Sequence, residues 1–373
     1  MNILIFSWRG PGHPNAGGAE ISTHEHAKEW ARAGHDVTLF TSSYVGSKKK
    51  ETVDGVSIIR EGHQVFGVHL KGLRWYLFGK HKRYDLVIDQ FHGIPFFTPL
   101  FVRAKKLAFI HEVAKEVWWL NSWQKPLNLI PAILGTIFEP LVFRFFYRNV
   151  PFMTVSQSTK KDLIGWGIAG RDIKVIHNGV NIPKVEITAK EKRKTLIFLG
   201  ALSKDKGIED AIKVFSKIAE KKTNFQFWVV GKSDPEYLKF LKKGCKDANI
   251  QNKVKFWGYV WENKKFELLS KAHVLINPSI REGWGLVVIE AAAVGTPTVA
   301  FDVPGLRDSI IEGKTGLLCS KNTVDDLVEN ILELVENKQK YLKMRREAIS
   351  YSRNFSWKKA GQESLKFIEA IVK

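Results

Sequence analysis

Residues 273–301 read HVLINPSIREGWGLVVIEAAAVGTPTVAF. An apolar run ends at Pro278, a second one starts near Thr296, and a glycine-spaced loop with an alanine-rich segment lies between them. Short β-rich runs separated by a helical segment are typical of a β-α-β unit with parallel strands. The same alternation recurs along the chain, so the sequence predicts an α/β protein with doubly wound parallel sheets.

Two series of such units follow one another. The first contains NILIFS, DVTLFT, VSIIR, YDLVID, KLAFIH and FMTVS, and the second contains TLIFLG, FQFWVVG, KVKFWG, HVLINPS and TPTVAF. A polar stretch without apolar periodicity, residues 183–194, separates them and predicts a linker. A chain of 373 residues also exceeds what one core usually organises.

We therefore expect two Rossmann-like domains that face a cleft, with the acceptor side in residues 1–183 and the donor side in 184–352. The apolar spacing in residues 353–373 predicts a C-terminal helix that packs back on the first domain.

The chain is strongly basic, with 58 Lys/Arg against 38 Asp/Glu and a net charge of +20. The excess is even: 24 basic against 14 acidic residues up to residue 185, and 34 against 24 after it. Such a charge favours phosphorylated substrates or anionic lipid as partners. No recognised nucleic-acid-binding module accompanies it, so we expect no nucleic acid partner.

The compartment is predicted from cysteine usage and the N-terminus. Two scattered cysteines do not form a disulfide framework, and MNILIF is too short for a secretory signal. The apolar stretch 129–147 carries Pro131, Glu139, Pro140 and Arg144, which argues against a spanning helix but allows it to lie on a membrane. We expect a cytoplasmic protein, with peripheral attachment to the cytoplasmic face of a membrane as an open alternative.

Two glutamates flank the start of the helix predicted in the opening stretch. Glu282 lies on the glycine loop and Glu290 about one turn inside a helix that starts near Leu286. The amides of Gly285, Leu286 and Val287 would form a helix N-terminus, which is a site for an anion such as a diphosphate. Carboxylates on either side of an anion site indicate polyols there, a ribose at one end and a sugar at the other.

The segment from Asn277 to Leu318 resembles the donor-binding segment of family 4 glycosyltransferases, retaining enzymes of the GT-B fold, including their E-x7-E pattern. GALSKDKG at 200–207 resembles the family's phosphate loop, VIHNGVNI at 175–182 its strand and turn before the linker, and WVVGKSD at 228–234 its nucleotide-side strand. NAGGAE at 15–20 resembles its N-terminal glycine loop. The resemblance covers most of the chain, with the motifs in the family's order.

The resemblance implies a role for each of these residues. Glu282 would hold sugar hydroxyls, Glu290 the ribose hydroxyls and Lys206 the diphosphate, while His111, at the end of a strand, would approach the donor sugar. Glu282, His111 and Lys206 are the candidate catalytic residues. The candidate donor-binding residues are Gly17, Gly18, Lys204, Lys206, Gly283, Trp284, Gly285, Leu286, Val287 and Glu290.

One position departs from the family. Ala201 stands where the family usually has an arginine, whose loss would weaken stabilisation of the leaving group. We expect Lys204 to supply the missing charge, and a solvated Lys204 is the alternative.

The family implies retention at the anomeric carbon in a reaction on one face of the sugar, without a protein nucleophile. The donor would be a nucleotide sugar such as a UDP- or GDP-sugar. No D-x-D sequence and no metal-ligand spacing occurs, so we expect no obligatory metal and no cofactor.

The acceptor is indicated only by basic and aromatic stretches. Residues 71–83, KGLRWYLFGKHKR, hold five Lys/Arg and three aromatic residues, and three tryptophans occur at 118–123. Such stretches suit an anionic membrane surface, or else a charged face over a core. We expect a glycan or lipid-linked acceptor, in cell-envelope polysaccharide or glycolipid synthesis.

Other functions of the same fold class fit the sequence less well. An NAD-dependent oxidoreductase is disfavoured because no G-x-G-x-x-G follows the first strand. Nucleotide-sugar epimerisation is less consistent with the E-x7-E loop. A non-catalytic sugar-nucleotide-binding or membrane-surface protein remains the alternative, since Ala201 replaces the arginine.

Overall fold

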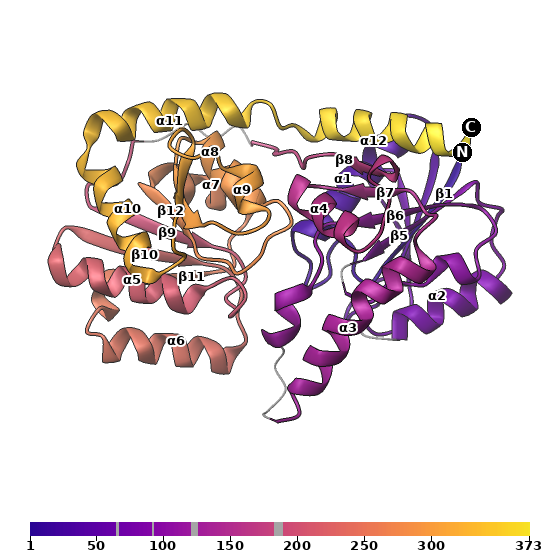
Figure 1. Cartoon of the computed structure of the whole chain (residues 1–373), viewed down its shortest axis with the longest axis horizontal. Coiled ribbons are helices and arrows are strands. Elements are labelled where there is room, and N and C mark those ends of the chain that lie inside the picture. Colours follow the sequence, from indigo (N-terminus) through magenta and orange to yellow (C-terminus); the bar gives the residue numbers. More distant parts are fainter. Residues whose placement is uncertain (65–66, 92, 121–125, 183–188) are drawn as a thin grey trace. The chain divides into compact units, whose positions relative to one another are not determined.

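The chain forms two compact units (Figure 1). The computed structural model describes residues 1–64, 67–91, 93–120, 126–182 and 189–373. Unit 1 comprises Met1–Gly179 and Ser356–Lys373, and unit 2 comprises Val180–Phe355. Each unit is built on a mainly parallel sheet covered by helices, which confirms the predicted α/β class. The first part of the expected linker, residues 183–188, lies outside the described residues, and its last residue, Lys194, begins strand β9.

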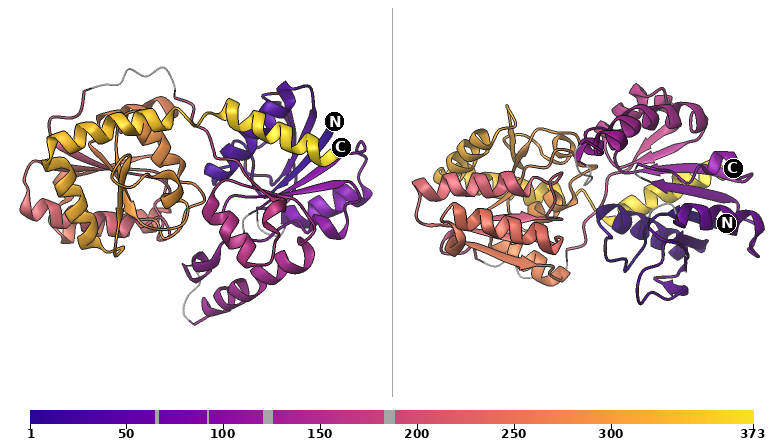
Figure 2. Two further views of the ribbon diagram at one scale, coloured as in Figure 1. Left: turned by 45° about the horizontal axis from the view of Figure 1, so that its top comes forward. Right: turned by 90° about the horizontal axis from the view of Figure 1, so that it is seen from below.

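Unit 1 contains the first eight strands, the first four α-helices and the last one (Figure 2). Its strands are β1 Asn2–Ser7, β2 Asp36–Thr41, β3 Lys50–Val53, β4 Val56–Arg60, β5 Leu86–Phe91, β6 Lys105–Ile110, β7 Phe152–Thr154 and β8 Ile173–Val175. Its helices are α1 Gly18–Arg32, α2 Gly67–Phe78, α3 Leu129–Phe146, α4 Gln157–Gly165 and α12 Trp357–Val372, with short helices η1 Thr98–Leu100, η2 Lys115–Leu120 and η3 Gly170–Asp172.

The strand order of unit 1 is β3-β4-β2-β1-β5-β6-β7-β8. All pairs are parallel except β3 with β4, a hairpin in which only β4 belongs to the predicted series. The chain builds outward from β1 in one direction and then from β5 in the other. The order therefore reverses between β1 and β5, and open α/β sheets bind ligands at the carboxyl ends of the strands at such a point.

Unit 2 contains the remaining elements. Its strands are β9 Lys194–Leu199, β10 Phe225–Val230, β11 Val254–Gly258, β12 Val274–Asn277, β13 Thr298–Phe301 and β14 Gly316–Cys319. Its helices are α5 Ile208–Lys221, α6 Pro235–Asp247, α7 Glu262–Lys271, α8 Leu286–Ala293, α9 Leu306–Ser309, α10 Val324–Glu336 and α11 Lys338–Ser352, with η4 Gln251–Lys253.

The strand order of unit 2 is β11-β10-β9-β12-β13-β14, with all pairs parallel. The order reverses between β9 and β12. The loop after β9 contains GALSKDKG, and the loop after β12 contains Glu282. Its main core is formed by apolar residues of these strands and of α5 and α10, including Phe215, Phe227 and Leu327, all fully buried. The β9 and β12 loops are thus anchored at both ends by core elements.

The last helix returns to unit 1, where α12 packs against α1 (Figure 1). Ser364 Oγ lies 2.9 Å from Trp30 Nε1 and 2.8 Å from His26 Nδ1, and all three residues are buried. The contact is close, because a Cβ at Gly361 would lie 2.4 Å from Glu29 Cγ. The unit boundaries fall at Gly179 and Ser356, where the sequence analysis placed them at 183 and 353.

Helices α2 and α3 cover one face of the sheet of unit 1. Along β5, Val87 packs in the cluster that contains residues of α2, and Phe91 packs in the cluster that contains Phe143 of α3. These alternate residues share a face of the strand. Between them the buried Asp89 accepts a hydrogen bond from Tyr147 Oη at 2.5 Å, which holds the C-terminal end of α3 to the sheet.

Helix α3 is the most unusual element of unit 1. It is long and apolar enough to cross a membrane by length and composition, yet only 17% of it is buried inside the protein. In Figures 1 and 2 it runs beside η2 and extends beyond the edge of the sheet.

The basic stretch 71–83 is partly a core element, which agrees with the second of the two alternatives for it, a charged face over a core. Trp75 and Tyr76 pack against the cluster around Phe6 and Phe40, and Phe78 is the exposed aromatic residue. Charged and aromatic residues are interleaved in the sequence of α2 because one side of the helix packs on the core and the other side faces solvent.

Candidate active site

The loops after β9 and β12 meet at the point where the strand order of unit 2 reverses. Ile280 N donates a hydrogen bond to Asp205 O at 2.9 Å, and Gly207 packs so closely on Pro278 that a Cβ there would lie 2.1 Å from the Pro278 carbonyl oxygen. Gly207 also has a φ of 72°, a left-handed conformation that favours glycine. Gly207 is thus required for two reasons: the turn needs a left-handed conformation, and Pro278 leaves no room for a side chain.

This loop contact brings two predicted catalytic residues together. Lys206 Nζ lies 3.0 Å from Glu282 Oε1, and Ser279 Oγ donates to the same oxygen at 2.8 Å. Asp205 lies 4.0 Å from the Lys206 ammonium. The side chains of Lys206 and Glu282 are 25% and 16% exposed, so the pair is shielded but still open to solvent.

The helix start beside this pair has the predicted form. Helix α8 begins at Leu286, and its cap Gly285 has a φ of 74°. A Cβ at Gly285 would contact the Leu306 side chain at 3.0 Å. The first amides of a helix have no acceptor within the helix, so Leu286 and Val287 offer donors to an anion.

Two other residues of this loop have buried side chains or backbones. Gly283 and Trp284 are buried, and the Trp284 ring lies 5.2 Å from the Phe355 ring in an edge-on arrangement. Trp284 therefore fixes the loop from the inside.

Glu290 lies within α8 and has a partner that sequence reasoning missed. Its Oε1 is 2.7 Å from Lys265 Nζ of α7, and its side chain is 13% exposed. Burial raises the pKa of Glu290, and the Lys265 ammonium opposes that shift. The sequence does not single out Lys265 as a partner of Glu290, because several helices carry charged residues at similar spacing.

The structure shows the surroundings of Ala201, which stands where the family usually has an arginine. Ala201 and Lys204 are both exposed, and Lys204 O accepts a hydrogen bond from Gly207 N at 3.1 Å. Arg281, directly before Glu282, is a further cation that the sequence analysis did not weigh, and it is 4% exposed. An arginine beside a motif cannot be identified as a site residue from the sequence alone, because the sequence does not show whether it is buried.

The glycine loop of unit 1 lies at the carboxyl end of β1, where the strand order reverses. Gly17 caps α1, but its N–H already donates to Glu20 Oε2 at 2.7 Å, and Glu20 is buried and pairs with Arg9 at 2.9 Å. The amide of Gly17, a candidate donor-binding residue, is thus hydrogen-bonded within the protein, and Gly18, the next candidate, begins the helix. The competing carboxylate is the last residue of NAGGAE itself.

His13 and His111 are buried near this edge of the sheet. His111 follows β6, is 5% exposed, and its Nε2 lies 3.5 Å from Thr23 Oγ1 of α1. Thr159 Oγ1 donates to His111 O at 3.1 Å, which fixes the backbone at the strand end. His13 lies in the loop after β1 and was not among the residues predicted from the sequence. Its burial lowers its pKa, and the positive charge of nearby Arg9 lowers it further.

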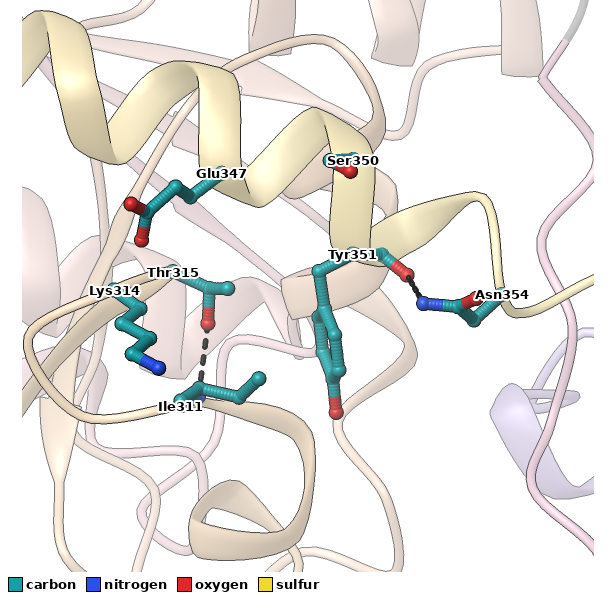
Figure 3. A pocket seen from close by; sticks show the side chains of 7 residues that line it. All are labelled: Ile311, Lys314, Thr315, Glu347, Ser350, Tyr351 and Asn354. Atoms are coloured by element: carbon teal, nitrogen blue, oxygen red, sulfur yellow. Dashed lines mark hydrogen bonds between the residues drawn. The ribbon is translucent and has the colours of Figure 1, made fainter.

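A pocket elsewhere in unit 2 involves none of the predicted residues (Figure 3). It is lined by Ile311, Lys314, Thr315, Glu347, Ser350, Tyr351 and Asn354. Its internal hydrogen bonds, Ile311 N to Thr315 Oγ1 at 2.8 Å and Asn354 Nδ2 to Tyr351 O at 3.0 Å, hold the 311–315 turn and the end of α11. We assign these residues a structural role.

Comparisons with known proteins identify the family of this chain. Residues 16–183 match the family described as Glycosyltransferase Family 4, and residues 182–355 match the one described as Glycosyl transferases group 1. The two matches overlap at residues 182 and 183 and together include residues of both units. The chain belongs to the family 4 glycosyltransferases. It is a glycosyltransferase with the GT-B fold.

Individual relatives of this glycosyltransferase are distant. An uncharacterized glycosyltransferase of Methanocaldococcus jannaschii is 25% identical over 343 residues, which are 85% of this chain and 84% of the relative. Sucrose-phosphate synthase from Thermosynechococcus elongatus is 19% identical with a TM-score of 0.78, over 99% of this chain and 98% of that one. HepE of Anabaena in complex with UDP and glucose is 18% identical with a TM-score of 0.74, over 99% and 100%. At these identities the solved structures show a common fold.

Proposed function

We propose that this glycosyltransferase transfers a sugar, with retention at the anomeric carbon, from a nucleotide sugar to a hydroxyl of a glycan or lipid-linked acceptor. The observation that carries the proposal is the Lys206–Glu282 pair at 3.0 Å, beside the start of α8. A cation, a carboxylate and helix amides at one strand edge match a ligand with both a diphosphate and hydroxyl groups.

The donor would be held in three parts. Lys206 and the amides of Leu286 and Val287 bind the diphosphate, Glu282 accepts hydrogen bonds from sugar hydroxyls, and Glu290 accepts them from the ribose. Ser279 and Lys265 orient the two carboxylates through the contacts at 2.8 Å and 2.7 Å. HepE, of the same fold, was solved with UDP and glucose, so UDP-glucose is the first donor to test and GDP-sugars are next.

The reaction would need no protein nucleophile. The leaving phosphate helps to deprotonate the acceptor hydroxyl on the face from which it departs, and Lys206 with the α8 amides stabilises its growing charge in place of a metal. His111, at the end of β6, would approach the donor sugar. Lys204 supplies further positive charge where Ala201 replaces arginine.

The acceptor side is proposed from unit 1. Its segment 62–150 contains 12 Lys/Arg and 5 Asp/Glu, and exposes many apolar side chains. These features fit a lipid-linked acceptor at an anionic membrane surface, and thus a peripheral enzyme on the cytoplasmic face that acts in cell-envelope polysaccharide or glycolipid synthesis.

The test is a donor panel. Binding of nucleoside diphosphates and their sugars is measured by calorimetry, and hydrolysis of each donor is assayed with and without acceptors. One nucleotide sugar should bind and be hydrolysed slowly without acceptor, and the anomeric configuration of the transferred product should equal that of the donor. An inverted product would exclude the retaining mechanism.

Ala201 favours one other function, a sugar-nucleotide-binding protein without catalysis, because the leaving group lacks a bidentate cation. Donor binding without hydrolysis or transfer, over the whole panel of acceptors, would establish that function instead.

A further inference from the structure

The exposed apolar side chains of the described residues are concentrated in one part of unit 1. Of the 26 large hydrophobic residues that are exposed, 16 lie between residues 70 and 146. Ten of these lie in or directly before α3: Leu127, Leu129, Ile130, Ile133, Leu134, Ile137, Phe138, Leu141, Phe145 and Phe146. A contiguous apolar surface of this kind marks an interaction site, because scattered single residues are the usual case.

Helix α3 has two opposite sides. Ala132, Glu139 and Phe143 are buried and follow a spacing of seven and four residues, which places them on one side of the helix. Ile133 and Ile137, which lie on the other side, are exposed. We call this outer side the α3 face. It is formed by the exposed residues Ile130, Ile133, Leu134, Ile137, Phe138, Leu141 and Phe145.

Glu139 fixes the helix against the protein. Its Oε1 accepts a hydrogen bond from Ala114 N at 2.8 Å, and its Oε2 accepts from Lys115 N at 3.1 Å and Trp118 Nε1 at 2.9 Å. Gly135 permits this packing, since a Cβ there would lie 2.2 Å from the Trp118 ring. A spanning orientation of α3 would break these bonds and the contacts of Phe143 with the core of unit 1.

The charge around the α3 face favours one occupant. Lys71 and Arg74 of α2, on the same side of the sheet, are exposed, and so is Arg144 near the end of α3. Of the five acidic residues of segment 62–150, Asp89 and Glu139 are buried and accept hydrogen bonds from the protein, Glu112 is half-buried, and Asp85 and Glu116 are exposed, against twelve Lys/Arg in the same segment. Anionic lipid headgroups complement such a rim, and the hydrocarbon below them suits the apolar side chains.

We propose that α3 lies in the plane of an anionic membrane, with the α3 face inserted at the level of the headgroups and upper acyl chains, and Trp119 of η2 at the boundary. The usual polar side of an interfacial helix is replaced here by unit 1 itself. The proposal deepens and rests on the proposed function, because it names the surface at which a lipid-linked acceptor would be met.

The first experiment compares two double variants of the full chain. Ile133→Ser/Ile137→Ser removes two side chains of the α3 face that are 46% and 52% exposed. The control, Ile164→Ser/Leu342→Ser, removes two that are 47% and 40% exposed elsewhere. Cosedimentation is measured with vesicles of phosphatidylcholine and of phosphatidylcholine with phosphatidylglycerol.

Wild type and control should bind the anionic vesicles equally. The α3 variant should bind more than about tenfold more weakly, because each aliphatic side chain loses its transfer out of water. Because all four positions are exposed, thermal unfolding of both variants should match wild type. Wild type that ignores anionic vesicles at low salt, or an α3 variant that binds as wild type does, would overturn the proposal.

The second experiment distinguishes insertion from adsorption. A polarity-sensitive dye is attached through Leu134→Cys or, as control, Leu342→Cys, while the native Cys245 and Cys319 are 1% exposed and should not react. Anionic vesicles should shift the emission of the dye at 134 to the blue and leave that at 342 unchanged. Concentration-dependent dimers that disappear in the Ile133→Ser/Ile137→Ser variant, without any shift, would assign the surface to a second copy of the chain.

Donor hydrolysis separates this proposal from the proposed function. The α3 variant should bind nucleotide and hydrolyse the donor as wild type does, since none of the candidate site residues lies in α3. Wild type that hydrolyses the donor but ignores vesicles refutes the membrane surface alone. Wild type that inserts into vesicles but neither binds nor hydrolyses any nucleotide sugar refutes the proposed function.

Discussion

The ammonium group of Lys206 lies 3.0 Å from the carboxylate of Glu282, although the two residues belong to loops that follow different strands. The contact places a cation directly beside an acceptor of hydroxyl hydrogen bonds. Preorganised charge of this kind requires little rearrangement when charge develops in a transition state. Because each residue is also the other's partner, replacing one changes the surroundings of the other.

Lys206→Ala should slow sugar transfer by about 10² or more, by analogy with the loss of a single donor to an oxyanion. The control is Lys213→Ala on α5, whose side chain is exposed and pairs with Asp210 at 2.8 Å. Initial rates at saturating donor provide the measurement. A Lys206→Ala enzyme as fast as the Lys213→Ala enzyme would remove Lys206 from catalysis.

Glu282→Ala and Glu290→Ala should have different effects on two ligands. Glu290→Ala should weaken binding of the free nucleoside diphosphate, because the ribose loses its acceptor. Glu282→Ala should leave that affinity within a few-fold of wild type and reduce transfer from the complete donor, since it removes contacts to the transferred group. Calorimetry and transfer kinetics on both variants measure this, and equal losses for both ligands would contradict the assignment.

Lys204→Ala should reduce transfer further in an enzyme that already lacks arginine at Ala201. In Ala201→Arg, restoration of a bidentate cation should make the enzyme insensitive to Lys204→Ala. The double-variant cycle measures this coupling directly. Additive effects, or a silent Lys204→Ala together with a faster Ala201→Arg, would show that Lys204 does not compensate.

The stability of unit 1 should fall as the pH is lowered from 7.5 to 5. Burial lowers the pKa of His26 from 6.5 to about 3, so the folded form stays neutral while the unfolded chain takes up a proton. Stability from this group is complete above 6.5 and is lost by about 1.4 kcal/mol per pH unit below it, down to about pH 3. Urea unfolding should show that wild type loses about 2 kcal/mol more than His26→Gln over this range. Parallel losses in the two proteins would exclude His26 as the source.

Gly361→Val should destabilise the contact between α12 and α1 by about 1–3 kcal/mol, because its side chain would overlap Glu29. Gly244→Ala on α6 is the matched control, since no atom lies within 4 Å of a Cβ there, and it should stabilise the protein by about 0.5–1 kcal/mol. Both values come from denaturant unfolding. If Gly361→Val is neutral, α12 does not need this close approach.

Most strands were predictable from the sequence, because the two series of β-rich runs correspond to β1, β2, β4, β5, β6 and β7 and to β9–β13. Periodic apolar runs and left-handed turns are properties of neighbouring residues, so they are visible in a local stretch. The same is true of the start of α8 at Leu286. The hairpin strand β3, KETV, was missed because it is short and has only one apolar residue, and pairing with β4 defines it.

The partners of the site residues were decided by tertiary structure. Lys265 beside Glu290, Glu20 on the Gly17 amide and the inward packing of Trp75 each depend on which elements pack together, and a charged or aromatic residue has the same local signature whether it faces the core or solvent. The exposure of Ile133 and Ile137 is the clearest case. Residues 129–146 are predominantly apolar, a composition shared by buried, spanning and interfacial helices. Only the position of Glu139, Phe143 and Tyr147 against unit 1 determines which side remains outside.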